Sequence, residues 1–331
     1  MFNRRAICAA ICAGLLGIFV GGVQAQASAP QAGSYPTQPI RMVLPLSAGT
    51  TTDLVARAFA ERLGQRLGQT VIVENRPGAG GTLAAQVVAK APADGYTILL
   101  VNSQHAINPA AHLALPYDTL RDFTGLAMVA EAPSVITVPR ELGVNTLAEF
   151  IALAKKKPAS LNYGSGGSGS QTHLAGAYFA SKAGIQLTHV PYRTGADVIS
   201  DLVTNRIQSV FVPAPFVMGQ ITEGKLKALA VTGTARLPLL RDVPTVAESA
   251  IPGYEFSTWF GFVAPAKTPA PIVALLAKTI QAIAEDPAMK QRLTEQGLTP
   301  RTMVQREFDS YIKSEIERLG PIAKSSGVDN K

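Results

Sequence analysis

The chain has 331 residues and a formal net charge of +7, from 30 lysines and arginines against 23 aspartates and glutamates. This length exceeds the size at which a single hydrophobic core keeps growing, so we expect two lobes. The basic residues are scattered, and three consecutive lysines at 155–157 fit a solvated helix end better than a nucleic-acid surface. We therefore expect no nucleic-acid partner, and the mild positive excess favours encounter with a small anion.

The first 27 residues have the pattern of a secretory signal peptide. Arg4 and Arg5 precede an apolar stretch at 6–20, and the small residues at 23–25 form a cleavage site. The stretch is shorter than the roughly 20 residues that cross a bilayer, so export is predicted rather than a membrane span. Both cysteines, Cys8 and Cys12, lie in this segment, and no disulfide or cysteine-bound metal is expected in the mature protein.

A βαβαβ pattern follows from residue 35 onward. Strands are predicted at 40–44, 71–73 and 97–101. Apolar residues recur every fourth position at Val55, Phe59, Leu63 and Leu67, which predicts a helix that ends at Gly68, and a second helix is predicted at 82–90. This order predicts a parallel sheet with helices on both faces.

A second α/β unit follows. Thr146 and Glu149 have capping-box spacing and open a helix that runs to Lys157. Further strands are predicted at 161–163, 187–190, 207–212 and 226–231, and helices at 171–183, 197–204 and 216–223.

Two apolar stretches, 126–138 and 256–264, flank the second unit and are predicted to cross between the lobes. The tail, with helices near 271–285, 287–296 and 307–325, shows no strand and is expected to pack on the first lobe. Lobe one is therefore assigned to residues 35–128 plus 263–331, and lobe two to residues 129–262.

Two loops that join a strand to a helix are candidate ligand sites, because ligands of open α/β sheets bind beyond the carboxyl ends of strands. The first spans residues 45–53 and is rich in small hydroxyl residues. The second, at 164–170, contains only glycine and serine. Glycine lets the backbone approach a ligand, and unpaired amides at a helix start bind carboxylates. Ordinary N-capping turns are the alternative for both loops.

These residues support an enzyme or a metal site less well than a ligand-binding site. Residues 164–169 fit G-x-G-x-x-G, but the next strand ends without the acidic residue that binds a dinucleotide ribose. Ser168 lacks the second glycine of a nucleophile elbow, and His173 is expected to make a local hydrogen bond or to line the ligand site. The four histidines, at 105, 112, 173 and 189, lack metal-binding spacing. No enzyme activity, cofactor or metal is predicted.

Three larger side chains have two interpretations each. Tyr192 and Arg193 follow a strand of lobe two, where a ring and a guanidinium can face the cleft, but Arg193 fits a solvated surface charge equally well. Trp259, in the second crossing, is expected to pack in the hinge or the core rather than to stack on a ligand.

Several stretches resemble the substrate-binding proteins of tripartite tricarboxylate transporters, the Bug (Bordetella uptake gene) family. They are 35–41 (YPTQPIR), 73–81 (VENRPGAGG), 94–97 (DGYT), 105–109 (HAINP), 161–163 (LNY), 189–192 (HVPY), 242–249 (DVPTVAES) and 259–261 (WFG). The resemblance implies a type II periplasmic-binding-protein fold, with two α/β lobes joined by a hinge. It also implies a periplasmic protein, a small carboxylate ligand and integral-membrane transporter subunits as partners, and a monomer is expected.

By position, the resemblance implies ligand contacts from both lobes. The predicted set is Ser47, Ala48, Gly49, Thr50, Thr51, Asn102 and Ser103 in lobe one, and Ser165, Gly166, Ser168, Gly169, Ser170, His173, Tyr192, Arg193 and Val212 in lobe two. The family usually has two prolines and two glycines where residues 47–50 stand, so the carboxylate pose is expected to differ. Val212 and Pro213 replace an acidic residue and an asparagine, which favours an acidic or partly apolar ligand over an ammonium ligand.

The sequence thus predicts a binding protein that encloses a small carboxylate by lobe closure and delivers it to a membrane transporter. Two rivals remain. One is a receptor that reports the ligand to a membrane sensor, and the other is a secreted serine hydrolase that uses Ser165 or Ser168 with His173.

Overall fold

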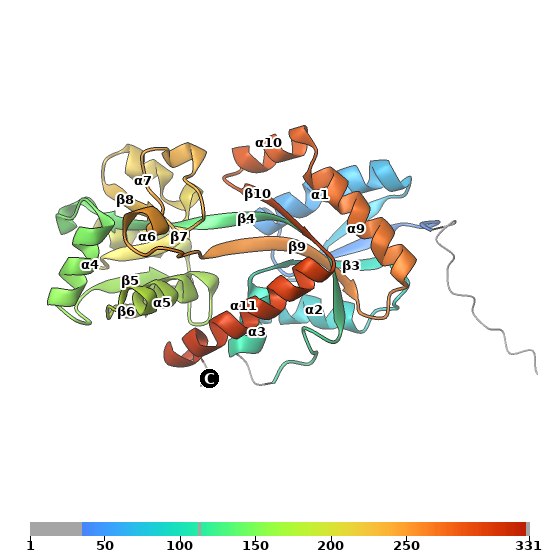
Figure 1. Ribbon diagram of the computed structural model, residues 1–331, viewed down its shortest axis with the longest axis horizontal. Helices are drawn as coiled ribbons and strands as arrows, with labels where there is room; N and C mark the ends of the chain where they lie inside the picture. Colours follow the sequence, from blue (N-terminus) through green and yellow to red (C-terminus); the bar gives the residue numbers. More distant parts are fainter. Residues whose placement is uncertain (1–34, 112–113, 329–331) are drawn as a thin grey trace, which may run out of the picture.

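The computed structural model describes residues 35–111 and 114–328, so the predicted signal peptide and His112 lie outside the described residues. Two α/β lobes lie side by side along the long axis of the molecule, and the strands β4 (Phe123–Pro139) and β9 (Ser257–Pro265) run from one lobe into the other (Figure 1). These strands are the two predicted crossings. Within the described ranges, no helix combines the length and the apolar character needed to cross a bilayer.

Lobe one begins with the predicted βαβαβ unit. Its elements are β1 (Ile40–Leu44), α1 (Thr51–Leu67), β2 (Val71–Asn75), α2 (Thr82–Ala89) and β3 (Thr97–Asn102). β1 pairs with β2 and β3 in parallel, as predicted, but the sheet then continues through antiparallel neighbours in the order β2-β1-β3-β9-β4. The lobe-one sheet is therefore mixed rather than purely parallel.

Strand alternation distributes apolar side chains to the two faces of this sheet. Ile40, Met42 and Leu44 point to one face and join the predicted apolar face of α1 and the later helix α9 (Ala270–Ala284). Val43 points to the other face, where α2 and the start of α11 (Arg306–Ser325) pack. Successive side chains of a strand point to opposite sides, so each face receives its own helical layer.

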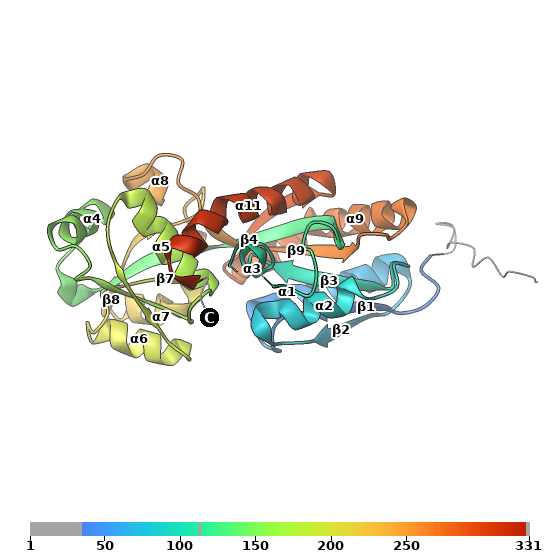
Figure 2. The ribbon, with the colours of Figure 1, turned by 90° about the horizontal axis from the view of Figure 1, so that it is seen from below.

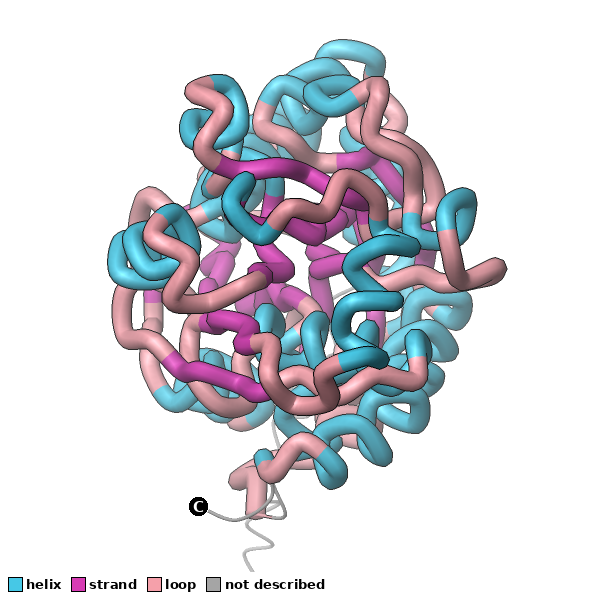
Figure 3. Tube along the Cα trace, turned by 90° about the vertical axis from the view of Figure 1, so that its left-hand side faces the viewer, coloured by secondary structure: helices cyan, strands magenta, loops and turns pink. Residues whose placement is uncertain are grey.

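Lobe two contains the predicted second unit. Its elements are α4 (Leu147–Lys156), β5 (Asn162–Ser165), α5 (Gln171–Ala183), β6 (Thr188–Pro191), α6 (Gly195–Val203), β7 (Ser209–Pro213), α7 (Met218–Thr222), β8 (Leu226–Val231) and α8 (Val246–Ser249). β5 pairs with β6 and β7 in parallel, and the second half of β4 lies antiparallel between β7 and β8. Seen from this end, the strands lie inside a shell of helices (Figure 3).

The tail differs from its prediction. After α10 (Pro287–Glu295), residues 299–304 form β10 (Thr299–Val304), which pairs antiparallel with β4. The sequence does not reveal this strand because Pro300 and Arg301 interrupt its apolar character and all its residues are half-buried. α3 (Gln104–Ala111) was also not predicted, since Pro109 inside it normally breaks a helix.

α11 contacts both lobes, whereas the sequence places the whole tail on lobe one. Phe308 and Ile312 pack in the lobe-one core, but Leu319 and Ala323 pack in the lobe-two core. The guanidinium of Arg318 lies 4.7 Å from the ring centre of Tyr178 in α5. Figure 2 shows α11 running along β4 and β9 from one lobe to the other, so it is a third connection between them.

Candidate functional site

A cleft of about 440 Å³ lies between the lobes and receives residues from both. Lobe one and the crossing strands contribute Leu46, Gly49, Thr50, Thr51, Thr52, Asn102, Ser103, Gln104, Ala132, Thr258 and Phe260, and lobe two contributes Gln171, Pro213 and Phe216. The starts of α1 and α5 therefore border the same cleft. Of the predicted residues of the first loop, Ser47 and Ala48 are exposed and are not among the residues that line it.

The first loop is held in place by its own side chains. Gly49 adopts a φ of 80°, in the left-handed region that favours glycine, and its N–H donates to the Asp53 carboxylate at 3.0 Å. Thr50 is the N-cap of α1, because its Oγ1 accepts from the Asp53 N–H at 3.4 Å. The same hydroxyl donates to the Ser47 carbonyl at 2.9 Å. N-capping is thus one role of this loop.

Two amides at the start of α1 remain free to bind a ligand. Among the described residues, the N–H groups of Thr51 and Thr52 have no hydrogen-bond acceptor, as expected for the first turn of a helix. Ser103 lines the same cleft with only 2% of its surface exposed, and its Oγ has no partner within the described chain. A buried hydroxyl without a partner is costly unless a ligand or water satisfies it.

The Asp53 carboxylate stabilises the first loop through several hydrogen bonds. It accepts from Arg57 Nε at 3.0 Å and from Asn75 Nδ2 at 3.0 Å. The Arg57 hydrogen bond, with further donors from Gly49 and Asn75, lowers the pKa of Asp53 from 3.8 to about 2 although burial opposes this shift. The carboxylate therefore stays ionised at neutral pH and fixes the turn that precedes α1.

The Gly/Ser loop of lobe two uses most of its amides internally. Gly166 N–H donates to Thr172 Oγ1 at 3.0 Å, Gly167 N–H donates to Ser165 Oγ at 3.1 Å, and Gly169 N–H donates to His173 Nδ1 at 3.1 Å. Ser170 is the N-cap of α5.

The amides of Gly166, Gly167 and Gly169 are therefore not free to bind a ligand. The N-capping alternative describes the loop instead. Gln171 and Thr172 keep N–H groups without an acceptor among the described residues, and Gln171 lines the cleft.

His173 is buried beneath this loop. Its ring stacks on that of His189, with centres 3.7 Å apart, and accepts from Gly169 through Nδ1. Burial lowers the pKa of His173 to about 4, with a further contribution from His189, and burial also lowers the pKa of His189. Both rings are therefore neutral at pH 7, and His173 supports the loop, which is one of the two roles that its position predicts.

The serine residues do not form the pair with His173 that the hydrolase alternative requires. His189 Nε2, not His173, lies 2.6 Å from Ser165 Oγ, and Ser165 is 1% exposed. Ser168 is exposed and lines a larger cavity of about 920 Å³ that also receives residues from both lobes. The other lining residues are Gly166, Gly169 and Ser170 of lobe two and Leu46, Ala79, Gly80, Thr82, Gln104, Asn108, Ala111, Ala114 and Leu115 of lobe one. The Gln104 side chain of lobe one reaches lobe two at this cavity, where its Nε2 donates to the Gly169 carbonyl at 3.1 Å.

An apolar subpocket of about 210 Å³ adjoins the cleft on the lobe-two side. It is lined by Ser165, Gly166, Thr172, Gly195, Val198, Ile199, Val212, Pro213 and Phe216. Pro213 and Phe216 line both the subpocket and the cleft. Val212, a predicted site residue, is thus brought next to the cleft.

Two predicted residues lie away from these cavities. The Tyr192 hydroxyl donates to Asp201 at 2.8 Å within lobe two, and Arg193 is exposed; neither lines the cleft or its two extensions. Trp259 is fully buried against Phe308 and Tyr311, so it packs in the core, as expected. In the part of the chain that the structure describes, no three acidic, histidine or cysteine side chains form a metal-binding group.

The residues that line the cleft but were not predicted as site residues are Leu46, Thr52, Gln104, Ala132, Gln171, Pro213, Phe216, Thr258 and Phe260. The positions of Thr52 and Gln171 in the first turns of α1 and α5 were a usable signal. Phe216 carried no such signal in the sequence, because only the packing of the 213–218 turn exposes its side chain beside the cleft. Within the described chain, no ionisable side chain lines the cleft or its two extensions.

Known proteins resemble this chain in both sequence and structure. Protein BugT of Bordetella pertussis is 32% identical over 321 residues, which cover 96% of this chain and 98% of BugT. The structure of R. palustris Rpa4515 with adipate is 35% identical, with a TM-score of 0.75, and the match covers 88% of this chain and 98% of that one. MatC (Rpa3494) from Rhodopseudomonas palustris with bound malate is 29% identical, with a TM-score of 0.70 and coverage of 87% and 100%.

The predicted type II periplasmic-binding-protein fold is confirmed by these neighbours. A family model described as the tripartite tricarboxylate transporter family receptor matches residues 55–328. Its members and the structural neighbours are solute-binding receptors, not enzymes, which removes the hydrolase rival. The chain belongs to the tripartite tricarboxylate transporter receptor family, as its resemblance to Bug proteins predicts.

Proposed function

We propose that this protein is a periplasmic receptor that encloses a small carboxylate between its lobes and passes it to the integral-membrane subunits of a tripartite transporter. The ligand carboxylate would lie at the start of α1. The protein would act as a monomer, and closure of the lobes would bring the start of α5 onto the same ligand.

One observation carries this proposal. Thr51, Thr52 and Ser103 line a single cleft between the lobes, and they carry two free N–H groups and one partnerless hydroxyl. These are all hydrogen-bond donors, and the positive end of a helix dipole adds to their attraction for an anion. The complexes of the relatives Rpa4515 with adipate and MatC with malate support a carboxylate as the anion.

The test removes one amide without removing the helix. Thr51 is the first residue of α1, where proline is tolerated, and Thr50 has the extended backbone (φ −77°, ψ 162°) that suits a residue before proline. Thr51→Pro deletes the N–H group, whereas the matched control Thr51→Ala keeps it and deletes only the side chain. Titration calorimetry with adipate, malate and hexanoate compares both variants with the wild type.

Thr51→Pro is expected to weaken binding by roughly 10- to 100-fold, the effect of one hydrogen bond to a charged group. Thr51→Ala is expected to lose much less. Equal binding by wild type and Thr51→Pro, or no binding of any carboxylate by the wild type, contradicts the proposal. The thermal unfolding midpoint of each variant without ligand shows whether the fold is intact.

A further inference from the structure

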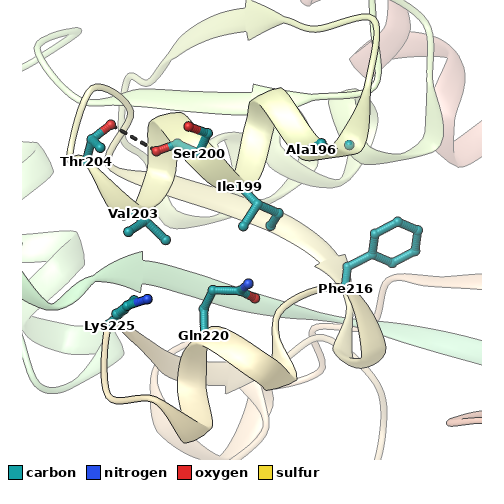
Figure 4. Close-up of a pocket in the computed structure, with 9 residues that line it drawn as sticks. Ala196, Ile199, Ser200, Val203, Thr204, Phe216, Gln220 and Lys225 are labelled. Atoms are coloured by element: carbon teal, nitrogen blue, oxygen red, sulfur yellow. Dashed lines mark hydrogen bonds between the residues drawn. The ribbon is translucent and has the colours of Figure 1, made fainter.

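Phe216 lies where three cavities meet. It lines the cleft, the apolar subpocket and an outer groove between α6 and α7, and 56% of its surface is exposed. Figure 4 shows the outer groove, with Lys225 at one end, Gln220 in the middle and the Phe216 ring at the other end, pointing away from both. A methyl group added at Gly195 would lie 3.6 Å from this ring, so the ring covers the start of α6. An exposed aromatic side chain in this position is available to a ligand.

The subpocket behind Phe216 suits an apolar group. Val198, Ile199, Val212 and Pro213 form its walls, and it holds about 210 Å³. A cavity of roughly 150 Å³ with apolar walls is enough for benzene. A ring or a short alkyl chain can therefore be buried here, with about a fourfold gain in affinity for each buried methylene group.

The larger cavity of about 920 Å³ offers a second carboxylate few free amide donors. Asn108 Nδ2 donates to the Gly80 carbonyl at 2.8 Å, and Gln104 Nε2 donates to Asn108 and to the Gly169 carbonyl. Gly166 N–H and Gly169 N–H are bonded within lobe two. These donors are therefore already used within the protein, and no ionisable side chain lines either extension within the described chain.

We propose, on the basis of the proposed function above, that the ligand is a monocarboxylate with an uncharged apolar body, and that Phe216 determines this specificity. The single carboxylate binds at the start of α1. The body crosses the cleft to Pro213 and Phe216 and fills the subpocket at Val212. A dicarboxylate of the same length would place its second charge in this subpocket, where Ser165 and Thr172 are the side chains that carry a polar atom and the remaining walls are apolar.

Matched ligand pairs test the specificity. Hexanoate and adipate have the same carbon chain and differ in one terminal methyl or carboxylate, and 4-methylbenzoate and terephthalate differ in the same way. Calorimetry on the full-length mature protein is expected to show at least about tenfold tighter binding of each monocarboxylate, because burying an unpaired carboxylate is costly.

Phe216→Lys supplies the missing cation at the subpocket, and the exposure of Phe216 makes loss of folding unexpected. This variant is expected to weaken hexanoate binding by about tenfold and to reverse the preference in favour of adipate. Gln220→Ala, in the outer groove but outside the cleft lining, is the control and should keep the wild-type preference.

The outcomes separate this inference from the proposed function. If adipate binds as tightly as hexanoate, and Thr51→Pro weakens both, the carboxylate site stands and the monocarboxylate assignment is overturned. If Phe216→Lys keeps the wild-type preference, the role of Phe216 is overturned. If no member of either pair binds to the wild type, both proposals fail.

Discussion

Asp53 shows how one side chain can maintain a binding loop without touching the cleft. It does not line the cleft, and only 4% of its side chain is exposed, yet it accepts hydrogen bonds from Gly49, Arg57 and Asn75. These bonds hold the turn whose last residues, Thr50 and Thr51, do line the cleft. The orientation of the free amides therefore depends on an ionised carboxylate beneath them.

Asp53→Asn is expected to lower the free energy of unfolding at pH 7 by roughly 1–2 kcal/mol, because it weakens hydrogen bonds to a charged acceptor. The folded-state pKa of Asp53 is lowered from 3.8 to about 2. Its stabilisation is therefore present above pH 3.8 and is lost as the pH falls towards 2. Urea unfolding at pH 7, 4 and 2.5 measures the difference between wild type and variant.

That difference should be nearly unchanged at pH 4, which lies above 3.8, and much smaller at pH 2.5. A difference that stays constant from pH 7 to 2.5 would show that the charge of Asp53 is not what stabilises the loop. Asp197→Asn, which changes an exposed acid in the first turn of α6, is the control and should have a smaller effect at pH 7.

At the scale of elements, β10 depends on an ion pair that crosses its sheet. Arg301 of β10 donates to the Glu131 carboxylate of β4 at 2.9 Å and also to Glu255. Only 2% of the Glu131 side chain is exposed, and burial raises its pKa while Arg301 opposes that shift. Glu131 sits where β4 leaves lobe one, so this pair stabilises the crossing between the lobes.

Arg301→Leu is expected to cost about 3 kcal/mol of unfolding free energy, because it leaves a buried carboxylate without its partner. The double variant Arg301→Leu with Glu131→Gln removes the unpaired charge of Glu131. It should recover most of the lost unfolding free energy. Chemical denaturation of the three proteins gives the comparison. A double variant no more stable than Arg301→Leu would mean that the pair has another role.

At the scale of the whole molecule, β4, β9 and α11 connect the lobes, and closure has to bend all three. A ligand shifts this equilibrium only if it binds the closed form better than the open form. The cleft meets this condition because Thr51 and Gln171, from opposite lobes, line the same space. Binding should therefore close the molecule.

Small-angle scattering with saturating hexanoate is expected to show a smaller radius of gyration than the ligand-free protein. At a hexanoate concentration about ten times the wild-type Kd, Thr51→Pro should show a smaller decrease in radius than the wild type, because at most about half of its sites are filled. An unchanged radius in saturated wild-type protein would show that binding occurs without movement of the lobes.

Local pattern alone determined most of the elements of this protein. The four-residue spacing of Val55, Phe59 and Leu63 and the turn at Gly68 predicted α1, and it is confirmed. Similar patterns predicted strands in both lobes, including the two that cross between them. The stretches that resemble Bug proteins predicted the family. These signals succeed because helix and strand periodicity is carried by neighbouring residues.

Tertiary structure decided which groups are free to bind a ligand. The amides of Gly166 and Gly169 are occupied by the side chains of Thr172 and His173, while those of Thr51 and Thr52 are not. β10 exists because β4 offers an edge, although its own residues alternate poorly. Phe216 reaches the cleft only because the lobes meet there. Hydrogen-bond partners and cleft walls come from distant parts of the chain, so no local pattern reveals them.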